Sequence, residues 1–168
     1  MHLPLHPEIP AGGVLLADYF AGSGYDLEAA DARLRVLMEA EGLEYRRGER
    51  TFNTLLAQEL AAWAEEVHGK KGIHHRLFRA YFVEQRDISD LEQLVAIADE
   101  LGLDPTDARK ALEGRHFRRR VDEDWQLSRR PGVTGVPTFA IEGRGVVGAQ
   151  PYDVLADLAR QAGVTPRR

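Results

Sequence analysis

The chain has 168 residues, enough for about one domain, or for one domain carrying a large insertion. Apolar residues make up 43% and charged residues 29%, which is ordinary for a globular protein with a sizeable core. The formal charge of −5 argues against a general nucleic-acid binder. No apolar run approaches the ~20 residues of a membrane helix. The apolar runs and the charge together predict no membrane or nucleic-acid partner. The first twenty residues hold no Lys or Arg, so we expect no secretory or transit signal and a cytoplasmic protein.

Cysteine is absent from the chain. Without a thiol this chain has no disulfide, no thiolate nucleophile, no Cys-ligated zinc and no iron–sulfur cluster. Glu65, His68 and His74 could surround a zinc ion, but they form no H-E-x-x-H motif, and solvated or capping histidines are the better interpretation. We therefore expect no catalytic residue, no metal and no cofactor on this chain.

Proline placement divides the sequence. No proline occurs from Ala11 to Asp104, whereas prolines mark the first ten and the last forty residues. Because proline breaks helices, this distribution predicts a helical block inside another structure. Apolar stripes at helical spacing support it. We expect the aromatic residues at this spacing to be core, with a groove toward Pro137 as the alternative for some of them: Trp63, Phe78, Tyr81, Phe82 and Trp125. The stripes run over Leu27–Met38 before Gly42, Leu56–Val67 before Gly69, and Leu77–Phe82.

Helix-start signals continue the block. Ser89 and Glu92 have the spacing of a capping box, which predicts a helix ending before Gly102. Asp104 followed by Pro105 predicts an N-cap with proline at the first helical position, and this short helix should end at Gly114. A last helix of the block is indicated by the spacing of Phe117, Val121 and Trp125.

The basic residues near this last helix alternate with acidic ones. We interpret them as a solvated helix face with ion pairs, in preference to nucleic-acid contact. The cluster comprises Arg115, Arg118, Arg119, Arg120, Arg129 and Arg130.

The final forty residues are rich in glycine and predict β structure. Val136–Ile141 and Val146–Val147 read as two strands, with Glu142–Gly145 as the turn. Pro151 then opens a helix that should end at Gly163. An isolated hairpin is marginal in water. We therefore expect the sheet to be completed by Met1–Leu5 and another chain, or to belong to a longer ancestral domain.

Pro137 stands where the first of these strands begins, so it costs no ladder hydrogen bond there. The bond between Val136 and Pro137 is a candidate for the cis form. Such a bend would leave the N–H and C=O of Val136 free to pair with an extended peptide. The alternative is an edge strand with a structural proline.

These residues resemble the cis-proline loop of the DsbA branch of thioredoxin-like proteins. The segment Gly145–Pro151, ending in Gly-Ala-Gln-Pro, is similar to the FrnE-like and 2-hydroxychromene-2-carboxylate isomerase-like members. Leu77–Phe82, Asp87–Asp90 and Gly102–Asp104 look like those members' helical insert, Phe52–Thr54 like its helix start, and His6–Pro10 like the loop after their second core strand.

The resemblance implies an α/β fold that is predominantly helical: a truncated thioredoxin-like fold with a large inserted all-α domain. It assigns residues 1–12 and 114–168 to the thioredoxin-like portion and residues 13–113 to the helical insertion. The family's first strand and Cys-x-x-Cys helix have no counterpart here. We expect Thr134, Gly135, Val136 and Pro137 to bind substrate.

Three functions remain open at this point. The first is a FrnE-like thiol–disulfide oxidoreductase domain that is inactive as this Cys-free chain, with an extended peptide or thiol substrate at the loop. The second is a non-catalytic peptide-binding or dimerisation module. A homodimer would pair the sheet edges that are open in the single chain. The third is a glutathione-linked isomerase of the 2-hydroxychromene-2-carboxylate type.

Overall fold

The computed structural model describes residues 2, 6–129, 133 and 135–164. They fall into two compact units, one reaching to Glu123 and the other beginning at Asp124. The expected strand at Met1–Leu5 lies almost wholly outside the described residues. The assignment of residues 13–113 to an insertion stays a prediction, because compactness alone does not show which segment was inserted.

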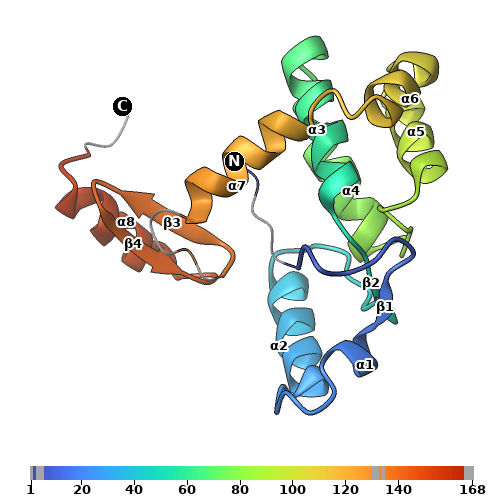
Figure 1. The fold of residues 1–168 in the computed structure, drawn as a ribbon. Helices are drawn as coiled ribbons and strands as arrows, with labels where there is room; N and C mark the ends of the chain where they lie inside the picture. Colours follow the sequence, from blue (N-terminus) through green and yellow to red (C-terminus); the bar gives the residue numbers. More distant parts are fainter. Residues whose placement is uncertain (1, 3–5, 130–132, 134, 165–168) are drawn as a thin grey trace. The chain divides into compact units, whose positions relative to one another are not determined.

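A cluster of four helices holds the core of the first unit (Figure 1). They are α3 (Leu55–His68), α4 (Ile73–Phe82), α5 (Leu91–Glu100) and α6 (Pro105–Glu113). The largest fully buried apolar side chains come from these helices and from α7 (Arg118–Arg129). These are Leu60, Ile73, Leu94, Ile97, Leu112 and Val121.

The ends of these helices follow from local sequence. Gly69 ends α3 in the left-handed conformation, as predicted for a C-terminal glycine. Asp104 accepts backbone hydrogen bonds from Thr106 (2.7 Å) and Asp107 (3.2 Å), with Pro105 at the first helical position. These predictions are confirmed.

The capping box at Ser89 is wrong. The N-cap of α5 is Asp90, whose carboxylate accepts from the backbone N–H of Gln93 at 2.9 Å. The Ser89 hydroxyl instead donates to Asp87 at 2.5 Å and accepts from the backbone N–H of Gly12 at 3.2 Å. The helix begins one residue later than a Ser89 cap requires, so the adjacent carboxylate takes that role.

Phe78 was also wrongly assigned to the core, since it is 61% exposed. Helix α4 buries Ile73, Leu77 and Ala80, which lie on one face at spacings of four and three. Phe78 follows Leu77 by about 100° around the helix and so leaves that face.

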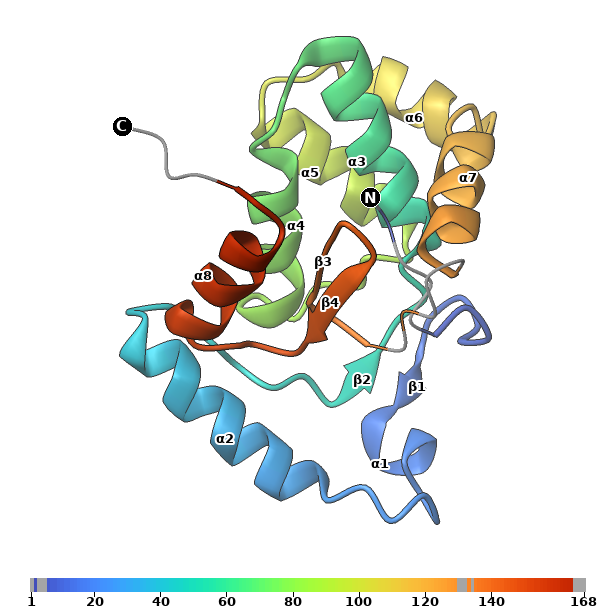
Figure 2. The same ribbon diagram turned by 90° about the vertical axis from the view of Figure 1, so that its left-hand side faces the viewer.

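The N-terminal part of this unit contains a two-stranded antiparallel ribbon that the sequence did not predict (Figure 2). Its strands are β1 (Val14–Leu15) and β2 (Arg50–Thr51). Arg50 fixes the approach to β1 by donating hydrogen bonds to the carbonyls of Gly12 and Gly13. The short helix α1 (Leu16–Tyr19) follows β1 directly.

Helix α2 (Leu27–Ala40) begins after Asp26 and ends before Gly42, as its stripe predicted. Asp26 caps it by accepting from the backbone N–H of Ala29 at 2.9 Å. None of its residues is buried. In both ribbon views α2 lies apart from the α3–α6 cluster (Figures 1 and 2).

The second unit contains a β-hairpin and a helix. Strands β3 (Thr138–Ile141) and β4 (Arg144–Val147) pair antiparallel, and α8 (Tyr152–Gln161) follows. The turn is shorter than the predicted Glu142–Gly145, because Arg144 and Gly145 already pair in β4. Glu142 (φ 48°) and Gly143 (φ 73°) both have positive φ, as a two-residue turn of type I′ requires. In the described part of the chain, no helix is long and apolar enough to cross a bilayer.

Candidate functional site

The segment that enters β3 is the candidate site. The peptide bond between Val136 and Pro137 is cis. Two hydrogen bonds hold the bend: the Thr138 hydroxyl donates to the Gly135 carbonyl at 2.6 Å, and the Gly148 N–H donates to the Pro137 carbonyl at 2.7 Å. The ends of the bend are therefore fixed by the first residue of β3 and by the residue that follows β4.

Val136 lies between these fixed points. Among the residues that the structure describes, its backbone N–H and C=O make no hydrogen bond. Its side chain is 54% exposed. A backbone donor and acceptor that remain unpaired on an exposed bend are available to another extended chain.

The neighbouring strand is open in the same way. Within the described residues, β3 pairs only with β4, which leaves its other edge without a ladder partner. Phe139 of this strand is 40% exposed. Mostly apolar side chains of β3 and α8 line a shallow groove beside it, with Thr138 as the polar one: Thr138, Phe139, Ala140, Ile141, Leu155, Leu158 and Ala159.

Three of the four predicted substrate-binding residues, Gly135, Val136 and Pro137, are thus brought together on one bend. The fourth, Thr134, lies outside the described residues. Gln150 belongs to the Gly-Ala-Gln-Pro segment, but the sequence analysis gave it no contact. Its side-chain amide donates to the Val147 carbonyl at 2.6 Å and holds the chain after β4.

The residues considered for a zinc site make other contacts in the structure. His74 pairs with Glu65 at 3.2 Å, while His68 packs edge-on against Trp63 at 4.7 Å between ring centroids. The three residues considered for zinc therefore do not converge in the structure. No group of metal-ligating side chains converges elsewhere in the described chain.

The arginine cluster is paired with carboxylates, as its interpretation as an ion-paired face predicted. Arg118 pairs with Asp122 at 2.9 Å on its own helix, and Arg120 reaches Glu66 of α3 at 2.6 Å. Arg130 and the side chain of Arg129 lie outside the described residues.

A helical block followed by a β-hairpin and a terminal helix is the element order that the resemblance to the DsbA branch predicts. Residues 1–160 match the family model of the DSBA-like thioredoxin domain. The chain belongs to this family, and the prediction of a predominantly helical, thioredoxin-like α/β fold is confirmed.

Solved structures agree with this assignment. The chain is similar to a probable DsbA oxidoreductase from Streptomyces coelicolor, with 30% identity and a TM-score of 0.76, over 91% of this chain and 69% of that one. It also resembles the cytosolic disulfide reductase DsbM from Pseudomonas aeruginosa, in a structure with GSH, with 26% identity and a TM-score of 0.57, over 91% and 82% of the two chains.

A curated relative is the protein YwbO of Bacillus subtilis, which is 32% identical over 106 residues, or 61% of this chain. The chain spans about half of that relative's length, since the match covers 52% of it.

Proposed function

We propose that this chain is the substrate-holding part of a DsbA-type thiol–disulfide oxidoreductase and is redox-inactive by itself. The observation that carries the proposal is the bend at Val136, whose backbone donor and acceptor have no partner among the described residues and adjoin the edge of β3 that no described strand covers. An extended polypeptide pairing there would add a strand to the sheet, with main-chain hydrogen bonds giving affinity for many sequences. Thr134, Gly135, Val136 and Pro137 are the residues that we assign to this contact.

The chemistry of disulfide exchange limits what the chain does alone. A thiolate must attack one sulfur of the disulfide while the other sulfur leaves as a thiolate. With no cysteine in its 168 residues, the chain supplies neither the attacking thiolate nor a disulfide of its own. The reacting thiolate must come from outside these residues, and this chain would position the substrate for it.

An insulin-reduction assay tests the redox part of the proposal. With dithiothreitol as reductant, we expect the chain to leave the rate of insulin precipitation at that of the reductant alone. A thioredoxin at the same concentration is the positive control. Acceleration by the purified chain would overturn the claim of redox inactivity.

A second candidate function, a binding or dimerisation module, is favoured by one further observation. No residue of the described segment from Gly135 to Val164 is buried. Large apolar side chains on it are exposed, among them Val147 at 48% and Tyr152 at 85%. A second copy of the chain pairing along β3 would cover this surface and the edge that no strand among the described residues occupies.

Light scattering separates the two functions. A monomer at micromolar concentration that still binds extended peptides supports the oxidoreductase proposal. A dimer that loses its peptide affinity as it forms supports the module. The FrnE-like branch and a cytoplasmic location also stay proposals. The Gly145–Pro151 motif supports the first, and the similarity to the cytosolic disulfide reductase DsbM supports the second.

A further inference from the structure

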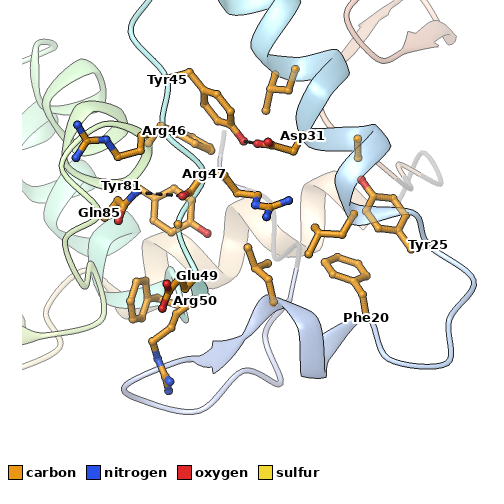
Figure 3. A pocket seen from close by; sticks show the side chains of 17 residues that line it. Phe20, Tyr25, Asp31, Tyr45, Arg46, Arg47, Glu49, Arg50, Tyr81 and Gln85 are labelled. Carbon is orange, nitrogen blue, oxygen red and sulfur yellow. Dashed lines mark hydrogen bonds between the residues drawn. The ribbon is translucent and has the colours of Figure 1, made fainter.

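Helix α2 forms one wall of a cavity of about 400 Å³ in the first unit (Figure 3). Segment 45–50 and the end of α4 lie on the opposite side, and every residue that lines the cavity belongs to the same compact unit. The residues that α2 contributes to the lining are Leu27, Ala30, Asp31 and Leu34. Because these residues share one face of the helix, a movement of α2 away from segment 45–50 would open the cavity to solvent.

Helix α2 is weakly packed for its length. None of its 14 residues is buried, whereas α3, which also has 14 residues, buries seven of them. Leu34 and Leu37 remain 37% and 46% exposed. Segments with few buried apolar contacts open locally at a small cost in free energy. The attachment of α2 therefore depends mainly on its polar contacts.

Two polar contacts join α2 to segment 45–50, and we name them the latch contacts. The hydroxyl of Tyr45 donates to the Asp31 carboxylate at 2.9 Å, and Arg47 pairs with Glu28 at 2.8 Å. Figure 3 shows the first of them crossing from segment 45–50 to the helix. Glu28 and Asp31 are three residues apart and so lie on the same side of α2. Within the described residues, no other side chain of α2 makes a hydrogen bond or ion pair outside the helix.

Segment 45–50, which carries the other half of each latch contact, is itself held to the end of α4. The Arg46 N–H donates to the Phe82 carbonyl at 2.7 Å. The side-chain amide of Gln85 donates to the Arg47 carbonyl at 3.0 Å (Figure 3). Segment 45–50 is therefore fixed to the helical cluster, and α2 is the side of the cavity that can move.

Glycines flank α2 at both ends. Gly24 (φ 74°) precedes the helix and Gly42 (φ 65°) follows it. A Cβ at either position would meet nothing within 4 Å, so the space around both glycines is open. Glycine has the widest range of backbone conformations, and small residues at the ends of elements often absorb the change in a hinge motion.

We propose that α2 is a lid on this cavity, which the two latch contacts hold closed and which opens as an intact helix about Gly24 and Gly42 when they break. The inference does not rest on the proposed function, since the bend at Val136 lies in the other compact unit. A hydrogen bond to a carboxylate shifts a two-state equilibrium by roughly 10-fold or more. Loss of the Tyr45 hydroxyl should therefore raise the open fraction by about 10-fold.

The distance between two spin labels tests the proposal on the full chain. Because the chain has no cysteine, Val36→Cys on α2 and Val67→Cys on α3 would carry its only labels. Both side chains are well exposed, at 66% and 57%. Pulsed electron–electron double resonance should give one main distance in this labelled protein. Adding Tyr45→Phe should raise the population of a second distance about 10-fold, and adding Glu28→Gln as well should raise it further.

Tyr25→Phe is the matched control. Tyr25 lines the same cavity, but its hydroxyl makes no hydrogen bond among the described residues, so this variant should leave the distance distribution unchanged. Identical distributions for Tyr45→Phe and Tyr25→Phe would overturn the proposal. So would a second distance that appears together with a loss of helix in circular dichroism, because α2 would then be unfolding and not moving as a lid. If the variant that lacks both latch contacts does not fold, Tyr45→Phe alone decides.

Discussion

Tyr45 donates its phenolic hydrogen to the carboxylate of Asp31 across 2.9 Å, which ties the segment before β2 to helix α2. Burial of the phenol, followed by this hydrogen bond and the charge of Asp31, raises the pKa of Tyr45 to about 12. The Arg35 hydrogen bond keeps the pKa of Asp31 below its usual value, so the acceptor is ionised at neutral pH. This contact is a principal attachment of α2, which has no buried residue.

Tyrosine titration checks this relationship. Because the folded pKa of Tyr45 is raised, its contribution to stability is complete below the unfolded pKa near 10 and disappears as the pH rises toward about 12. Absorbance at 295 nm should therefore show one phenol ionising late, and Tyr45→Phe should remove it. The comparison is best made with Tyr19→Phe also present, since the Glu8 hydrogen bond raises the pKa of Tyr19 too. If all remaining phenols titrate together near pH 10, the contact does not exist in solution.

Two adjacent glycines precede β1, and replacing each by alanine should lower the free energy of unfolding by a different amount. Both have positive φ, 78° at Gly12 and 69° at Gly13. A Cβ on Gly13 would lie 2.3 Å from the Thr51 carbonyl oxygen and 2.6 Å from the Phe52 ring, whereas a Cβ on Gly12 would meet nothing within 4 Å. Gly12→Ala should cost about 1 kcal/mol for backbone strain, and Gly13→Ala about 2 kcal/mol more. Urea unfolding measures both, and equal losses would contradict the close packing of the ribbon.

The carboxylate of Glu59 is only 1% exposed, so its stability depends on a charged partner. Arg115 donates to it through Nε at 3.1 Å and Nη2 at 2.5 Å. Arg115→Met would leave this carboxylate unpaired. We expect a loss of about 2–3 kcal/mol, somewhat below the cost for a wholly buried pair because the Arg115 side chain is 43% exposed.

Two controls accompany this variant. Arg119→Met removes an arginine that is 92% exposed and lies 3.8 Å from Glu123, so it should cost less than about 0.5 kcal/mol. Glu59→Met together with Arg115→Met should recover most of the stability, because no charge is then left unpaired. If Arg115→Met and Arg119→Met lower the free energy of unfolding by similar amounts, the ion pair between Arg115 and Glu59 contributes no more than an exposed pair.

Local signals account for the parts of the fold that the sequence predicted. Asp104 with Pro105, and Gly69, set helix ends through contacts within one turn, so neighbouring residues suffice to predict them. Ser89 was misassigned because its partner is Gly12, far away along the chain. Strands of two residues, such as β1 and β2, have too few positions to show a period.

In the candidate site, too, local features were predictable from the sequence and contacts between distant residues were not. The bend at Pro137 was visible because proline after a glycine-rich stretch is a local signal, and the resemblance to the DsbA branch gave it a role. The hydrogen bond from Gly148 that holds the bend depends on the hairpin register, as does the bond from Gln150 to Val147.

The central claim is that the bend at Val136 holds an extended chain while this protein performs no sulfur chemistry on it. Amide chemical shifts of the ¹⁵N-labelled chain, recorded during titration with an extended peptide that contains a disulfide, test both halves at once. The account predicts shifts at Gly135, Val136 and along β3, with the peptide disulfide intact at the end. Shifts confined to the helical unit, or a peptide whose disulfide has been opened, would contradict it.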